Sequence, residues 1–117
     1  MFCLLHGDFH LANAIWNNEQ KKLTLIDFEF VLVDHPSVDI GYLYVNMGRK
    51  MRKEHGDNFL QKYHSLMIAS GKVTPSEFTL AKFKQDVIAN GTARWAFLFV
   101  CLASFPVPDP DVIEACI

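Results

Sequence analysis

The sequence predicts a mainly helical α+β domain in which a small β-hairpin is followed by about four helices. Half of the 117 residues are hydrophobic and ten are phenylalanine, so one small domain with a buried core is possible. Two apolar segments, 14–16 and 23–26, flank the polar run "NNEQKK" at residues 17–22, which is typical of a hairpin. From residue 36 onward, apolar residues recur at helical spacing.

The segments before and within the hairpin alternate between apolar runs and polar connections. Residues 2–5 predict a short buried strand, and residues 6–13 have no consistent period, which predicts a loop. Asn13 then stands at the entry of the hairpin and Asp27 at its exit. Because a short turn joins the two strands, both ends lie on the same side, and we expect Asn13 and Asp27 to face each other.

Three helices are predicted from their start and stop signals. Pro36 suits the first turn of a helix, and the residues that follow it are mostly apolar. Residues 56–71 place apolar side chains at i, i+3, i+4 and i+7 and end in a glycine, which favours a second helix. The sequence "TPSE" at residues 74–77 has the pattern of a capping box, so we expect a third helix from there to Ala89.

The C-terminal part of the chain predicts a break, a buried helix and a tail. Asn90-Gly91 interrupts the helical pattern, and residues 92–104 are apolar enough for a core helix. Its aromatic residues are expected to pack in the core rather than to border a substrate pocket: Trp95, Phe97 and Phe99. Residues 105–117 begin with three prolines in close succession, which predicts a Pro-rich tail outside the helix.

Charge and composition exclude several classes of partner. A formal net charge of −2 and a pI near 6.2 do not favour nucleic acid binding, and the short basic cluster at residues 49–53 is expected to be a solvated helix face. Three widely spaced cysteines fit neither a disulfide framework nor a zinc motif. The first residues do not resemble a signal peptide, and the apolar run at 95–103 is too short to span a bilayer. We therefore expect a cytoplasmic protein without a membrane partner.

Three polar residues between positions 8 and 27 have the types and spacing that phosphoryl transfer uses. Asp8 and Asn13 are five residues apart, and Asp27 follows the hairpin. Carboxylate and amide oxygens are hard ligands that suit Mg²⁺, and a further carboxylate can orient a hydroxyl group and accept its proton. Protein kinases place a catalytic Asp, a metal-binding Asn and a second metal-binding Asp in this order.

The motifs "HGDFHLAN" at residues 6–13 and "LIDFE" at residues 25–29 resemble the aminoglycoside phosphotransferase and choline kinase-like family of small-molecule kinases. That family carries H-G-D-x-H-x-x-N as its catalytic loop and I-D-[FW]-[DE] as its metal site. The segment "HPSVDIGYL" at residues 35–43 is also similar to the family pattern. The resemblance implies the C-terminal lobe of a protein-kinase-like fold, with ATP and Mg²⁺ as cofactors and a small-molecule hydroxyl group as the acceptor.

The resemblance also implies a role for each matching residue. Asp8 would be the catalytic base, and Asn13 and Asp27 would be the Mg²⁺ ligands. His6 and His10 would brace the catalytic loop. Asp39 would anchor the loop by accepting hydrogen bonds from its backbone.

Residues 1–117 are therefore expected to form a partial kinase-like domain. It would consist of the catalytic loop at 6–13, the metal-binding segment at 25–29, a helical remainder at 36–104 and the tail at 105–117. No Gly-rich loop and no strand lysine precede residue 6, so the nucleotide-side lobe is expected elsewhere in the full-length protein. ATP-binding residues cannot be assigned on this chain, and the fragment is expected to be inactive alone.

Two alternatives remain open at this point. His6, Asp8 and His10 alternate along the chain, and on an extended strand they would share one face and could bind zinc for a hydrolytic reaction. Gly7 weakens that strand, and the zinc hypothesis leaves Asn13 unexplained. The second alternative is a non-catalytic remnant lobe.

Overall fold

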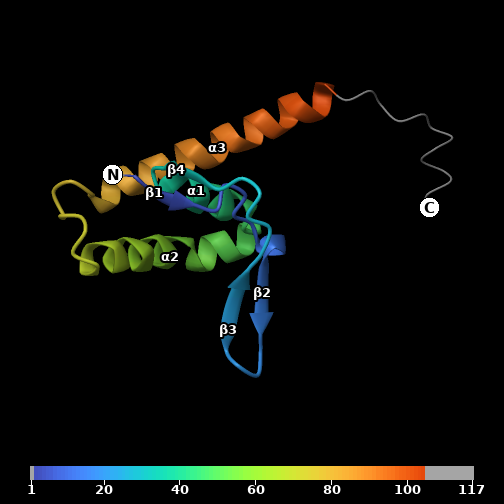
Figure 1. Cartoon of the computed structure of the whole chain (residues 1–117). Helices are drawn as coiled ribbons and strands as arrows, with labels where there is room; N and C mark the ends of the chain where they lie inside the picture. The colour runs from blue at the N-terminus through green and yellow to red at the C-terminus, as the bar shows by residue number, and fades with distance from the viewer. Residues whose placement is uncertain (1, 105–117) are drawn as a thin grey trace, which may run out of the picture.

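In the computed structural model, which describes residues 2–104, two small antiparallel sheets lie beside three helices (Figure 1). The predicted fold class, α+β and mainly helical, is confirmed. The predicted tail at 105–117 lies outside the described residues. Over residues 2–104, no helix combines the length and apolar character needed to cross a bilayer.

The first sheet was only partly foreseen from the sequence. Strand β1 (Cys3–Leu5) pairs antiparallel with β4 (Leu32–Asp34), with Leu4 opposite Val33. The prediction that this first strand is buried is wrong except at its end: the exposed fraction is 73% for Leu4 and 5% for Leu5. Alternate side chains of a strand point to opposite faces, and the face that carries Leu4 and Val33 is exposed. Leu5, the last residue of β1, therefore faces the core, and the loop begins directly after it.

The predicted hairpin is confirmed. Strands β2 (Ala14–Asn17) and β3 (Lys22–Leu25) pair antiparallel, and the hairpin projects away from the helices (Figure 1). Its turn is closed by a hydrogen bond from the backbone N–H of Gln20 to the side chain of Asn17, at 2.8 Å. At the other end, the backbone N–H of Ile26 donates to the carbonyl oxygen of Asn13, at 3.0 Å. This bond brings the entry and the exit of the hairpin side by side.

Helix α1 (Ser37–Asn46) begins directly after Pro36, as predicted, and crosses α3 (Leu80–Ser104) at close range. A Cβ atom added to Gly41 would lie 2.6 Å from the carbonyl oxygen of Val87, and one added to Gly91 would lie 2.5 Å from the carbonyl oxygen of Gly41. The two glycines therefore let the helix backbones touch. The predicted break at Asn90-Gly91 is wrong, because this glycine makes a helix crossing rather than a helix end.

Helix α2 (Arg49–Ala69) starts earlier than the predicted residue 56 and ends, as expected, before a glycine, Gly71, with a φ of +69°. Its first turns carry basic residues on a solvated surface, where the apolar spacing that marks a helix is missing. Its buried side joins α1, α3 and the connection between α2 and α3 in one core. The core residues are Ile40, Leu60, Val73, Phe78, Phe83 and Val87.

The capping box at residues 74–77 forms, but it does not start a helix. The backbone N–H of Thr74 donates to Oε2 of Glu77 at 3.2 Å, and the backbone N–H of Phe78 donates to the carbonyl oxygen of Thr74 at 3.0 Å. The turn brings Phe78 into the core. Helix α3 starts only afterwards, with the hydroxyl group of Thr79 accepting from the backbone N–H of Lys82 at 3.3 Å.

The second half of α3 extends beyond the other helices (Figure 1). The prediction of a buried helix at 92–104 is wrong, because several of its large side chains are exposed: Trp95, Phe97, Phe99 and Val100. The apolar side chains of this segment form a surface that the rest of residues 2–104 leaves largely uncovered.

Candidate active site

The loop at residues 6–13 is held in place by a buried carboxylate. Asp39 lies in the first turn of α1 and accepts hydrogen bonds from the backbone N–H groups of His6, at 2.6 Å, and Gly7, at 2.9 Å. Gly7 has a φ of +83°, and a side chain there would collide with the carbonyl oxygen of Phe30. A non-glycine residue would therefore disturb both the backbone conformation and the approach to the following segment.

His6 connects the loop to the segment that carries Asp27. Its Nε2 lies 2.8 Å from the carbonyl oxygen of Ile26, and its ring centroid lies 4.4 Å from that of Phe28. Because a carbonyl oxygen only accepts, Nε2 carries the hydrogen in this contact. Nδ1 is buried and has no hydrogen-bond partner within residues 2–104. His6 therefore ties the two predicted motifs together on both sides of Asp27.

Asp8, His10 and Asn13 form a local hydrogen-bonded group. The side-chain nitrogen of Asn13 donates to the carbonyl oxygen of Asp8 at 3.0 Å and to its Oδ2 at 3.2 Å. His10 accepts at Nδ1 from the backbone N–H of Ala12, at 3.2 Å, so its proton lies on Nε2, which is 3.3 Å from Oδ2 of Asp8. Two donors of the loop therefore contact Oδ2 of Asp8, whose side chain is 20% exposed.

Asn13 and Asp27, the two predicted metal ligands, have side-chain oxygen atoms that accept no hydrogen bond within residues 2–104. Both side-chain hydrogen bonds of Asn13 use its nitrogen, so its Oδ1 accepts none within the described residues. Asp27 is exposed, and its side chain makes no hydrogen bond or ion pair with residues 2–104. Its φ of 63° lies in the left-handed region, which aspartate tolerates better than most residues. Non-glycine residues in this backbone conformation are found more often at functional sites than elsewhere.

Arg94 is a residue of this site that the sequence did not reveal. Its Nη2 lies 3.5 Å from Oδ1 of Asp8 and 3.4 Å from the carbonyl oxygen of Gly7. In the sequence, it is separated from Asp8 by most of the chain and stands alone as the charged residue of the apolar stretch 93–103. That isolation was the available signal, since a single arginine among large apolar residues needs a specific partner.

The zinc hypothesis for His6, Asp8 and His10 is not supported. Residues 6–10 do not form a strand, and Gly7 turns the backbone with its positive φ. His6 then contacts Ile26 while His10 contacts Asp8, so the imidazoles have separate partners. In the part of the chain that the structure describes, no three His, Cys, Asp or Glu side chains are grouped closely enough to hold a metal ion.

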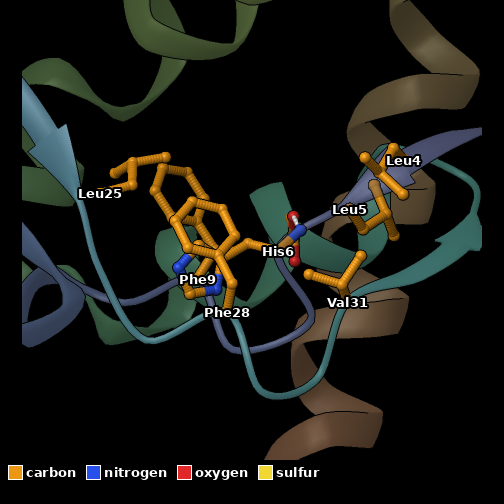
Figure 2. A pocket seen from close by; sticks show the side chains of 8 residues that line it. Leu4, Leu5, His6, Phe9, Leu25, Phe28 and Val31 are labelled. Atoms are coloured by element: carbon orange, nitrogen blue, oxygen red, sulfur yellow. Dashed lines mark hydrogen bonds between the residues drawn. The ribbon is translucent and has the colours of Figure 1, made fainter.

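A mostly apolar pocket of about 230 Å³ lies beside the loop. Figure 2 shows the rings of Phe9 and Phe28 next to His6 on one side, and Val31 near the end of β1 on the other. The lining residues are Leu4, Leu5, His6, Phe9, Leu25, Phe28, Val31 and Asp39. The pocket therefore lies on the face of the loop where β1 and segment 25–31 meet.

A rigid loop that carries carboxylate and amide oxygens, next to an exposed aspartate at a hairpin exit, is typical of phosphoryl transfer. The family model of the phosphotransferase enzyme family (APH) matches residues 1–75, and this chain belongs to that family. The predicted family is thereby confirmed. The matched region includes both motifs, α1 and α2, whereas α3 with Arg94 lies beyond it. Neither the curated proteins nor the solved structures contain a match to this chain.

Proposed function

We propose that this chain carries the transfer site of an ATP-dependent kinase that phosphorylates a hydroxyl group on a small molecule. Asp8 would accept the hydroxyl proton, and Asn13 and Asp27 would hold Mg²⁺ on the nucleotide phosphates. Membership of a phosphotransferase family supports the reaction class. The acceptor is proposed only as an alcohol of the kind used by aminoglycoside or choline kinases.

The observation that carries this proposal is the double hydrogen bond of Asn13 to Asp8. Because both bonds use Nδ2, the amide group is oriented with its oxygen directed away from the Asp8 carboxylate. One side chain therefore sets the orientation of the proposed base and of a proposed metal ligand together. Such preorganisation of reacting groups contributes strongly to catalysis.

The available donors fit Mg²⁺ better than zinc. Mg²⁺ is commonly held by one or two protein carboxylates, together with substrate phosphates and water. Asn13 and Asp27 would supply two oxygen ligands, and a dedicated cluster of protein ligands is not required. When bound with ATP, the ion supplies charge neutralisation at the β- and γ-phosphates.

The supporting residues keep Asp8 in place for proton acceptance. Asp39 fixes the backbone before it, and His10 donates to its carboxylate. His6 holds the segment that carries Asp27 against the loop. In this proposal the roles of His6, His10 and Asp39 are structural, and the proton is transferred to Asp8 alone.

The proposed arrangement is the C-terminal lobe of a protein-kinase-like fold, with a nucleotide-side lobe required for full activity. The segment after Asp27 exposes a series of large apolar side chains: Phe28, Phe30, Val31, Leu32 and Val33. Apolar surface of this kind is typical of an interface. The division into a catalytic loop at 6–13, a metal segment at 25–29 and a helical remainder belongs to this proposal, as does a cytoplasmic location.

The same exposed surface favours a second candidate, a non-catalytic remnant lobe that binds a partner. A thermal-shift titration of the full chain with Mg²⁺ and ATP separates the two candidates. The kinase proposal predicts a rise of several degrees in Tm at saturating ligand, because a ligand that binds only the folded state stabilises it.

The variants Asp27→Asn and Asp57→Asn provide a matched test. Asparagine tolerates the left-handed conformation of Asp27, so the first variant removes charge with little backbone penalty. Asp57 lies in α2 and pairs with Lys84 away from the loop. The shift should shrink in Asp27→Asn and persist in Asp57→Asn. No shift in the unmodified chain, either alone or joined to a nucleotide-side lobe, would instead support the remnant lobe.

A further inference from the structure

We propose that Arg94 is a positioning residue that holds the carboxylate of Asp8 in its working orientation. The inference rests on the proposed function, because it assigns a purpose to the orientation of the proposed base. Oδ2 of Asp8 has two neighbouring donors, the Asn13 amide and the His10 ring. Oδ1 has one, the Arg94 guanidinium at 3.5 Å. Without Arg94, one end of the carboxylate would have no donor within the described residues.

Arg94 reaches the loop at two points. The same nitrogen, Nη2, contacts Oδ1 of Asp8 and the carbonyl oxygen of Gly7, which precedes it in the chain. A single group therefore restrains the side chain and the backbone of the proposed base together. Arginine suits this task, because its planar guanidinium keeps several donors in a fixed geometry, whereas a lysine presents one compact charge.

The guanidinium is itself held by aromatic rings. Its central carbon lies 5.2 Å from the ring centroid of Tyr42 in α1 and 6.0 Å from that of Phe97 in α3. Its Nε is buried and has no acceptor within residues 2–104, so the hydrogen bonds of this side chain all go to the loop. Cation–π contacts of this kind restrict the position of the charge.

The backbone that carries Arg94 is also fixed. One turn earlier, the side chain of Asn90 donates to Oγ of the buried Ser37 at 2.7 Å, and Gly91 lies in the close crossing with α1. Helix α3 is therefore docked on α1 immediately before Arg94. This placement links the packing of two helices to the orientation of one carboxylate, which is the arrangement expected of a positioning residue.

The test uses the full 117-residue chain with Arg94→Met and Arg94→Gln. Both variants remove the charge, and glutamine keeps the residue polar in case methionine prevents folding. Arg52→Met is a matched control, because Arg52 also lies over a tyrosine, Tyr44 at 5.9 Å, and donates to a backbone carbonyl oxygen. Among residues 2–104, Arg52 contacts no carboxylate.

The readout is the side-chain amide signal of Asn13 in nitrogen-15 NMR spectra, together with its hydrogen exchange. That amide bonds to Asp8 and therefore reports on the carboxylate. Loss of a charge-assisted contact should speed its exchange about tenfold in both Arg94 variants. Arg52→Met should leave it unchanged. Unchanged Asn13 exchange in the Arg94 variants, or equal acceleration along the whole of α3, would overturn the proposal.

These results are independent of nucleotide binding. If Mg²⁺ and ATP do not bind but Arg94→Gln still accelerates exchange at Asn13, the proposed function fails while the contact between Arg94 and Asp8 stands. If the nucleotide binds and neither Arg94 variant affects Asn13, Arg94 does not position Asp8. The two ideas therefore fail separately.

Discussion

The loop at residues 6–13 and the second half of α3 differ in the kind of side chain that they bury. The loop encloses polar groups: His6 and Asn13 are buried, and their side chains hydrogen-bond to Ile26 and to Asp8 respectively. The end of α3 does the reverse and exposes Phe97 and Phe99. Burying polar groups is costly unless they are paired, whereas exposed apolar groups are tolerated more easily. The conformation of the loop is therefore fixed by specific hydrogen bonds, whereas the end of α3 presents an exposed apolar surface.

The two regions meet at Arg94, the charged residue of an otherwise apolar stretch, which points back to the loop. Substitutions in the loop should therefore change chemistry and local order. Substitutions along the rest of α3 should instead change stability according to their burial.

The largest expected effect is on phosphoryl transfer. Asp8→Ala should lower the rate by at least about 100-fold, because a positioned general base contributes on the order of 10²- to 10⁴-fold. The rate is measured as transfer of labelled γ-phosphate to alcohol acceptors by the chain joined to a nucleotide-side lobe. Asp57→Ala is the control and should retain activity. A rate within a few-fold of the unmodified protein after Asp8→Ala would contradict the assignment of the base.

Two phenylalanines of α3 give the sharpest comparison in stability. Phe83 is 1% exposed and Phe97 is 58% exposed, although both lie on the same helix. Phe83→Ala should cost about 3–5 kcal/mol of unfolding free energy, and Phe97→Ala, which removes the contact with Arg94, should cost no more than about 1 kcal/mol. Urea denaturation measures both. A large loss on Phe97→Ala would mean that the end of α3 is covered in solution.

Asp39→Ala should cost about 2–4 kcal/mol, because it leaves the N–H groups of the buried His6 and the half-buried Gly7 without their acceptor. Hydrogen exchange should show the loss first at residues 6–13, while the amides at the centre of α2 remain protected. Uniform loss of protection throughout the chain would contradict a specific role for Asp39 in holding the loop.

The smallest effect concerns pH. Burial lowers the pKa of His35 from its usual value of 6.5, and Asp86 opposes the shift. The unfolded chain therefore binds this proton more readily than the folded chain, so stability should decline as the pH falls below 6.5. Comparing Tm at pH 7.5 and 5.5 should show a smaller decline in His35→Gln than in the unmodified chain. An equal decline in both would exclude His35 as a contributor.

Features set by neighbours in the sequence were predictable. The hairpin follows from polar residues between two apolar runs, and the start of α1 follows from Pro36. The family follows from the motifs at 6–13 and 25–29. In each case the signal and the structure lie within a few residues of each other, so the local pattern was sufficient.

Features set by distant contacts were not predictable. Gly91 was interpreted as a helix break because its partner in the crossing, Gly41, is fifty residues away. The apolar end of α3 was interpreted as core because composition does not show what covers a helix. Arg94 was missed for the same reason, since its contact with Asp8 appears only once α3 is docked on α1.

The most direct test of the shared metal site is a titration of the nitrogen-15-labelled chain with ATP and Mn²⁺, a paramagnetic substitute for Mg²⁺. The amide of Asp27 and the side-chain amide of Asn13 should broaden first and together, with Asp8 close behind, while Asp57 stays sharp. Broadening at Asp57 before Asn13 and Asp27, or at only one of those two, would contradict a cation held between the loop and the hairpin exit.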